Sequence, residues 1–315
     1  MINSNYFSED QINLLADAKN NKKYVHLKNE NIRLKEVMSL KNLNHIISTP
    51  NYWNKKNFLL VLDKKNIPFE KYSTIGDKYG FSDLSPDPII VERFIKKGAS
   101  LVLNNLNYLS DNIKKLSLDL QNITNGKCQA NLYFSMQSHQ AFAPHFDTHD
   151  VFALHCEGEK VWNIYENFEN DPINHSIFKS KPEEIAKKCG KMIEQVLLKP
   201  GDLLYLPRGQ FHDALASRNG AIHIAFGITY MKPIDLFQYY WEEYIVNEYF
   251  RSDIREIKSK EDVEIIHNKI SSEFKKIFNN QKLLDHSLDY FKSFPYNIIN
   301  YNIEKIVEDG VQYEI

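Results

Sequence analysis

The sequence predicts an α+β fold in which a small antiparallel barrel or two-sheet jelly roll lies between a helical lead-in and a helical C-terminal region. From residue 129 to residue 230, six short strand-like runs are separated by turn signals. This spacing is typical of a barrel whose interior holds one small ligand. Helical and strand patterns alternate before these runs, and helical patterning takes over after them.

The composition limits the classes of protein that this chain can represent. Its 315 residues are 43% hydrophobic, enough to bury a large core as one elaborate domain or two smaller ones. The net charge of -2 excludes a general basic field, so we expect no direct binding of nucleic acid. The three cysteines, an odd number without a CxxC spacing, argue against a disulfide framework and a thiolate zinc site.

The expected location is the cytoplasm, without a membrane partner. No apolar run approaches the length of a membrane span, and the N-terminus has neither a cationic start nor an apolar stretch typical of a signal peptide. The unpaired cysteines also fit a reducing compartment.

Several elements are predicted ahead of the barrel. Ser8 to Gln11 has the spacing of a capping box that opens a short helix. A second helical pattern covers residues 31–47, and an apolar run that ends at Leu62 indicates a buried strand. Gly98 separates a helix over residues 89–97 from a strand over residues 99–103, and a further helix begins after Ser110 and reaches about Leu120.

The barrel strands are predicted over residues 131–136, 151–156, 160–165, 196–198, 202–206 and 221–230. Pro200 and Gly201 suit the second and third positions of a type II turn. These observations divide the chain into a domain over residues 1–232, with its barrel core at about 98–232, and a helical region over residues 233–315.

The first predicted helix of the C-terminal region, residues 235–250, carries more aromatic residues than a helix that only faces solvent. It therefore packs either on its own chain or against another copy. The region is accordingly a candidate dimerisation domain.

One stretch of the chain carries the strongest chemical signal. His145 and Asp147 lie two residues apart, so in a strand both side chains would point to the same face and Phe146 to the other. His212 follows its own strand-and-turn signal and is the best third ligand. Two histidines and one carboxylate form the facial triad of non-haem Fe(II) oxygenases.

A His-x-acid pair alone is weak evidence, because a chain with 11 histidines and 41 acidic residues contains about one by chance. A second pair, His155 and Glu157, runs into Gly158, and we interpret it as the end of a strand at a hairpin. His139, His149 and His175 are expected in loops.

Three linked motifs carry a resemblance to a known family. They are Pro144-His-Phe-Asp-x-x-Asp-Val-Phe152, Gly158-Glu-Lys-Val-Trp162 and Pro200-Gly-Asp-Leu-Leu-Tyr-Leu-Pro-x-Gly-x-x-His212. In order and spacing they resemble the cupin-type JmjC ribosomal oxygenases, which include arginine and histidine hydroxylases of ribosomal proteins. The resemblance covers about residues 131–227 and implies a double-stranded β-helix core.

The resemblance implies an Fe(II)- and 2-oxoglutarate-dependent dioxygenase that uses O2 and forms succinate and CO2. His145, Asp147 and His212 would be the metal ligands, and Lys160 would bind the distal carboxylate of 2-oxoglutarate. In a strand Lys160 shares a face with Trp162, so its ammonium would be buried and need an anion. The alternative is a surface lysine that extends its charge into water.

Asn131 and Tyr133 match an Asn-x-Tyr that the family places near the co-substrate, and His223 is a further candidate beside it. Each could equally be a buried polar group with satisfied hydrogen bonds.

The substrate is less constrained than the cofactors. Family members usually continue past the helical dimerisation region into a winged-helix module, whereas residues 233–315 suffice for the helical part and leave little for that module. We expect a protein or peptide side chain as substrate, a ribosomal protein being one candidate. The alternatives are a small molecule or biosynthetic peptide, a metal cupin with non-oxygenase chemistry, and a binding module without turnover.

Overall fold

The computed structural model describes residues 4–28, 32–49, 52–75, 84–136, 139–217, 220–254 and 257–294. These residues form two compact units, of which the first extends to Thr229 and the second begins at Tyr230. The sequence predicted a boundary after Lys232. The end of the predicted helical region, residues 295–315, lies outside the described residues.

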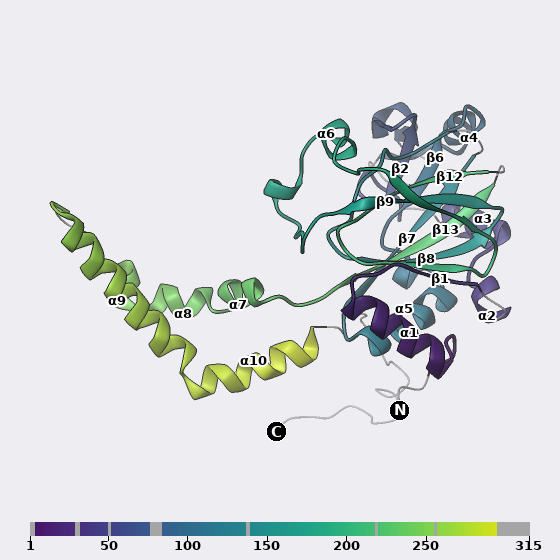
Figure 1. Cartoon of the computed structure of the whole chain (residues 1–315). Coiled ribbons are helices and arrows are strands. Elements are labelled where there is room, and N and C mark those ends of the chain that lie inside the picture. The colour runs from purple at the N-terminus through teal and green to yellow at the C-terminus, as the bar shows by residue number, and fades with distance from the viewer. Residues whose placement is uncertain are drawn as a thin grey trace, which may run out of the picture. The chain divides into compact units, whose positions relative to one another are not determined.

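Two antiparallel sheets face each other in the first unit (Figure 1). The large sheet has the strand order β1-β11-β8-β13-β7-β6-β2-β3, and the small sheet has the order β10-β9-β12. Apolar residues of both sheets form a common core, with Val151 and Leu204 from the large sheet against Trp162 and Leu198 from the small one. This core fixes the separation of the sheets.

The strands of the large sheet are β1 (Val25–Leu27), β2 (Phe58–Leu62), β3 (Lys65–Ile67), β6 (Ser100–Leu103), β7 (Lys127–Ser135), β8 (Asp150–Glu157), β11 (Leu203–Leu206) and β13 (Ala221–Thr229). Those of the small sheet are β9 (Lys160–Phe168), β10 (Met192–Leu198) and β12 (Gln210–Ala216). A separate ribbon consists of β4 (Ser73–Ile75) and β5 (Leu84–Pro86).

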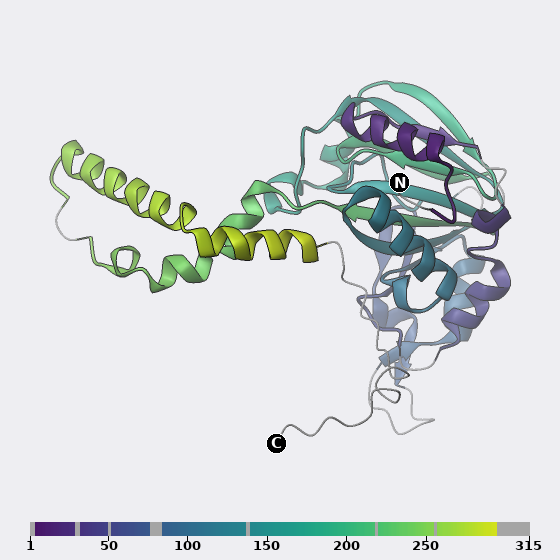
Figure 2. The same cartoon turned by 90° about the horizontal axis from the view of Figure 1, so that it is seen from below.

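The helices of the first unit are α1 (Glu9–Asn20), α2 (Ile32–Lys35), α3 (Leu40–Ile47), α4 (Pro88–Lys96), α5 (Asp111–Thr124) and α6 (Pro182–Ala186). The capping box predicted at Ser8 and Gln11 is present at the start of α1. Helix α5 packs against β7 and β13, and α1 contacts β1. Both helices lie on the same side of the large sheet in Figure 2, so they cover its outer face.

All six predicted barrel strands are present, and the type II turn is confirmed by Gly201, which has φ +97°. The sequence reading missed β12, the strand that carries His212, because its alternation is interrupted by small and polar side chains. The helix predicted over residues 31–47 was wrong in extent: the described residues form two helices, and Ser39 caps the second.

The second unit contains α7 (Pro233–Tyr239), α8 (Trp241–Val246), α9 (Lys260–Phe278) and α10 (Gln281–Ser293). The single helix predicted over residues 235–250 is therefore interrupted at Tyr240. Tyr240 and Tyr244 pack with Ile277 and Leu283 of α9 and α10. Part of the aromatic face is thus an intrachain packing surface. Among the described residues, no helix combines the length and apolarity needed to cross a membrane.

Candidate metal centre

The three predicted ligands come from two segments of different structure. His212 lies in β12, whereas His145 and Asp147 lie in an irregular segment before β8. The prediction that they occupy a strand was wrong. A single antiparallel bridge joins His145 to His212: the His145 N–H donates to the His212 oxygen at 3.0 Å, and the reverse bond is 2.8 Å. This bridge brings the two segments into contact.

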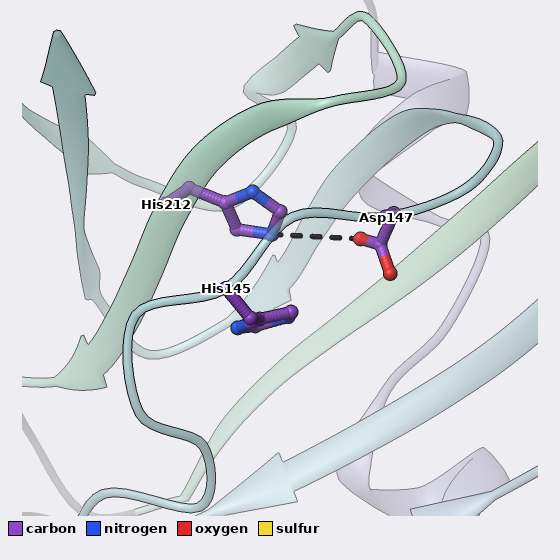
Figure 3. A group of neighbouring side chains, drawn as sticks. All are labelled: His145, Asp147 and His212. Carbon is purple, nitrogen blue, oxygen red and sulfur yellow. Dashed lines mark ion pairs between the residues drawn. The ribbon is translucent and has the colours of Figure 1, made fainter. Parts of the chain in front are cut away.

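The three side chains converge on one point, as Figure 3 shows. One candidate ligand atom from each residue lies within 4.8 Å of the other two. Nε2 of His212 is 3.6 Å from Oδ2 of Asp147, and the two imidazole centroids are 4.6 Å apart. The separations leave room for an ion between the donors.

Backbone carbonyls orient both imidazoles. Nδ1 of His145 lies 2.8 Å from the oxygen of Ala143, and Nδ1 of His212 lies 2.9 Å from the oxygen of Gln210. A carbonyl only accepts hydrogen bonds, so each Nδ1 carries the proton and each Nε2 keeps its lone pair. This is the tautomer that a metal-binding histidine needs.

The charge states also suit a cation. Burial lowers the pKa of His212 to about 4, and the neighbouring His145 contributes to that shift, so this imidazole is neutral near pH 7. Burial alone would raise the pKa of Asp147, but His149, His145 and His212 outweigh it, and the pKa lies below its usual value. The cluster therefore offers two imidazole nitrogens and a carboxylate.

Lys160 forms a second polar cluster in the same cavity. The residue is 5% exposed, which rules out the surface alternative. Its ammonium is 3.2 Å from Oγ of Ser135 and 3.3 Å from Nδ1 of His223. Among the described residues no carboxylate forms an ion pair with it, and burial alone lowers its pKa to about 7.

A cavity of about 260 Å³ contains both clusters. Aromatic rings form much of its wall. Trp162 stacks on His212 with centroids 5.5 Å apart, and Tyr133 stacks on His223 at 4.7 Å. Nε1 of Trp162 is buried and has no hydrogen-bond partner among the described residues. An N–H group in this state points to a missing acceptor. The lining comprises Tyr133, Ala141, Phe142, His145, Asp147, Val151, Lys160, Trp162, His212, Ala214, His223 and Ala225.

Of the remaining predicted site residues, some line the cavity and others lie outside it. Tyr133 and His223 line the cavity, whereas Asn131 does not and instead accepts a hydrogen bond from the Asn105 N–H at 3.2 Å. His155 is fully buried outside the lining, and its pKa is lowered by burial to about 4. His149, predicted only as a loop residue, packs on Gly227: a Cβ there would lie 3.0 Å from its ring.

Sequence reasoning missed Phe142, Ser135, Ala214 and Ala225 as parts of the site. Tyr133 and His223 were candidates through the resemblance, and the alternation of side chains within β7 and β13 puts Ser135 on the face of Tyr133 and Ala225 on the face of His223, so this alternation would have identified them. Phe142 precedes His145 in an irregular segment, where no periodicity indicates its direction.

The residues fit both implied groups. Two Nε2 atoms with free lone pairs and one ionised carboxylate suit a divalent transition metal. A buried ammonium without a carboxylate, together with the unpaired indole N–H, suits an anionic co-substrate.

The fold and this arrangement define a class of protein, the double-stranded β-helix or cupin proteins with a candidate metal centre of two histidines and one aspartate. Within that class, residues 104–236 match the JmjC domain family, and this match spans every strand from β7 to β13. This part of the chain is similar to proteins named as ribosomal oxygenases, which confirms the resemblance drawn from its three motifs.

Two curated relatives illustrate the similarity. The bifunctional lysine-specific demethylase and histidyl-hydroxylase NO66 of Drosophila persimilis is 34% identical over 165 residues, covering 49% of this chain and 23% of that protein. Ribosomal oxygenase 1 of Rattus norvegicus is 39% identical over 85 residues, covering 27% of this chain and 14% of that protein. This chain thus matches less than a quarter of the length of either relative.

Solved structures share the fold. YcfD, a ribosomal oxygenase from Escherichia coli in complex with cobalt and 2-oxoglutarate, aligns with a TM-score of 0.59 at 19% identity, covering 93% of this chain and 76% of that chain. Another structure of E. coli ycfD gives a TM-score of 0.61 at 16% identity, covering 98% of this chain and 80% of that chain. The predicted fold class is confirmed.

Proposed function

We propose that this protein is an Fe(II)- and 2-oxoglutarate-dependent dioxygenase that hydroxylates a side chain of a protein or peptide. One observation carries the proposal: the cluster of His145, Asp147 and His212 and a buried ammonium without a carboxylate line the same cavity. Relatives named as a histidyl-hydroxylase and a ribosomal oxygenase support a protein substrate, and a ribosomal protein is the first candidate.

In this proposal each cluster holds one end of the reacting system. His145, Asp147 and His212 hold the metal through two Nε2 atoms and a carboxylate oxygen. Lys160 binds the distal carboxylate of 2-oxoglutarate, with Ser135 and His223 fixing the ammonium. When bound, Fe(II) provides the redox chemistry by which O2 oxidises 2-oxoglutarate to succinate and CO2 and hydroxylates a C–H bond.

The aromatic wall orients the reactants and limits access of water. The Trp162 ring contacts both clusters. It stacks on the His212 ring, and it packs edge-on against the His223 ring with centroids 5.4 Å apart. Its unpaired N–H can donate to a carboxylate in the cavity. Phe142, which is 41% exposed and lies 5.9 Å from the His145 ring, forms the outer wall where a substrate side chain enters.

The test is succinate formation from 2-oxoglutarate by purified protein with Fe(II) and ascorbate under air, with cell extract as a source of substrate. We expect extract-stimulated succinate and a protein or peptide product heavier by one oxygen atom. If the stimulating fraction of the extract contains only small molecules, the substrate is a metabolite and not a protein. No binding of Fe(II) or 2-oxoglutarate would contradict the oxygenase proposal as a whole.

We also propose that residues 233–315 form a separate region through which two copies associate. Besides its own core, the second unit exposes apolar side chains along three helices: Ile234, Phe237, Trp241, Ile245, Leu284, Leu288 and Phe291. An apolar surface of this kind is typical of an interface. Sedimentation should give a dimer, and Trp241→Glu combined with Leu288→Glu should give a monomer. A monomeric wild type would contradict the proposal.

A cytoplasmic location remains part of the proposal. Cys128 and Cys156 are buried and free, and burial raises the pKa of the Cys128 thiol to about 12. Unpaired, inert thiols fit a reducing compartment. Fluorescence of a tagged full-length chain would test this location.

A further inference from the structure

The two ligand-bearing segments are joined at more points than the bridge between His145 and His212. Gly209 lies in the turn between β11 and β12, and its N–H donates to the backbone oxygen of Asp147 at 2.9 Å. The turn that leads to one ligand therefore holds the backbone of another.

Asp150 adds a side-chain link between the same segments. It begins β8, three residues after Asp147, and is 4% exposed. Oδ1 accepts the backbone N–H of Arg208 at 2.9 Å, and Oδ2 accepts the hydroxyl of Tyr205 at 2.9 Å. A buried carboxylate with two donors forms charge-assisted bonds that hold their geometry strongly.

The turn has little freedom to adjust if this link is lost. Gly209 has φ +92°, and a Cβ there would lie 1.9 Å from the backbone oxygen of Glu169. The Glu169 N–H donates to the Gly209 oxygen at 2.9 Å, so the chain after β9 closes the turn from the other side. Displacement of Arg208 would therefore move Gly209, and with it the contact to Asp147.

We propose that Asp150 is a positioning residue for the metal centre. It acts through the backbone amide of Arg208 and the adjacent Gly209, and it sets the separation between Asp147 and His212. The inference rests on the proposed function in one respect, that a divalent cation binds between these ligands. It adds a residue that touches neither cation nor co-substrate.

The proposed role of Asp150 does not involve the side chain of Arg208. The guanidinium pairs with Asp171 at 2.9 Å on the surface, and Asp171 also pairs with Lys22. Surface pairs of this kind contribute little to stability. Because the contact to Asp150 uses the backbone, Arg208→Ala keeps it while removing the surface pair.

The experiment is titration of the metal-free full-length protein with Co(II), which measures the dissociation constant without turnover. We expect Asp150→Ala to weaken Co(II) binding by about 10–100-fold, the effect usual for groups that orient metal ligands. Asp150→Asn keeps an oxygen acceptor for the Arg208 N–H and should remain within about threefold of wild type, as should Arg208→Ala.

Asp119→Ala is the matched control, because Asp119 is a buried carboxylate on α5 that accepts a hydrogen bond from Ser4 and contacts neither segment. If Asp150→Ala does not fold, Asp150→Ser is judged by the same criterion. Equal weakening in the Asp150 and Asp119 variants, or wild-type binding in Asp150→Ala, would overturn the positioning role and leave the proposed function intact. Failure of wild type to bind Co(II) would overturn both.

Discussion

The cavity contains two polar clusters that are both buried and that differ in charge. At His145, Asp147 and His212, imidazoles surround a carboxylate whose pKa is lowered by the histidines around it. At Lys160, a serine hydroxyl and the His223 imidazole, whose pKa burial lowers well below its usual value, surround an ammonium whose pKa is also lowered by burial. The donors of the first cluster suit a cation, and the buried ammonium of the second suits an anion.

The difference indicates what kind of ligand satisfies the cavity. A cation alone would complete the first cluster and leave the ammonium uncompensated. In the proposed function, a dicarboxylate that reaches both the cation and Lys160 would complete both clusters together. Changes made to one cluster at a time would show whether the clusters act as these two halves.

Removal of a metal ligand should have the largest effect. Asp147→Ala or His212→Ala should weaken Co(II) binding by more than about 100-fold and abolish succinate formation, because two donors remain where three are needed. Calorimetric titration and a succinate assay measure these effects. His175→Ala, an exposed histidine outside the cavity, should behave as wild type. Turnover retained in both ligand variants would disprove the triad.

Replacement of Lys160 should affect the anion and spare the cation. Lys160→Met keeps the length of the side chain and removes its charge, so the KM for 2-oxoglutarate should rise by about 10–100-fold while Co(II) affinity stays within about threefold. Parallel loss of both affinities would show that the two clusters are not independent.

Between pH 7 and 9, a change in pH should alter the protonation of the Lys160 cluster and not that of the metal-ligand cluster. Because the pKa of Lys160 in the free protein is about 7, the ammonium loses its proton above that pH, and a dianion binds the protonated form. Affinity for 2-oxoglutarate should fall by about tenfold per pH unit above 7, with proton uptake on binding. Calorimetry in buffers of different ionisation enthalpy measures that uptake. In Lys160→Met the affinity for 2-oxoglutarate should not depend on pH in this range. The same pH dependence in both proteins would contradict the assignment of Lys160 as the titrating group.

Trp162 should show the smallest effect. Trp162→Phe removes the unpaired N–H and keeps an aromatic ring against His212, so the KM for 2-oxoglutarate should rise by about two- to fivefold, the loss of one hydrogen bond. The value of kcat should stay near that of wild type. An unchanged KM would show that the indole N–H does not face the co-substrate.

The strands could be predicted because their apolar alternation is local information. Lys160 and Trp162 were placed on one inward face by the period of two, and the structure confirms that both are buried. The three candidate ligands were identified from residue type and motif order, and the structure brings them together.

What could not be predicted depends on contacts between distant segments. The position of His145 follows from its bridge to β12, and β12 itself has a mixed pattern that pairs with β9 across a register shift. The break at Tyr240 arises because its ring enters the core formed with α9 and α10. Asp150 stood within a recognised motif, but its partner is a backbone amide that no sequence pattern identifies.

The bridge between His145 and His212 also has a consequence for how long the protein survives in a cell. It joins residues that are separated by 67 positions, so a denatured chain holds the ligands together only at the entropic cost of closing a long loop. A cation held by these residues would therefore bind the native topology far better than the unfolded chain and would stabilise it by mass action. A supply of the metal would therefore slow unfolding-dependent proteolysis of this protein, independently of its catalytic turnover.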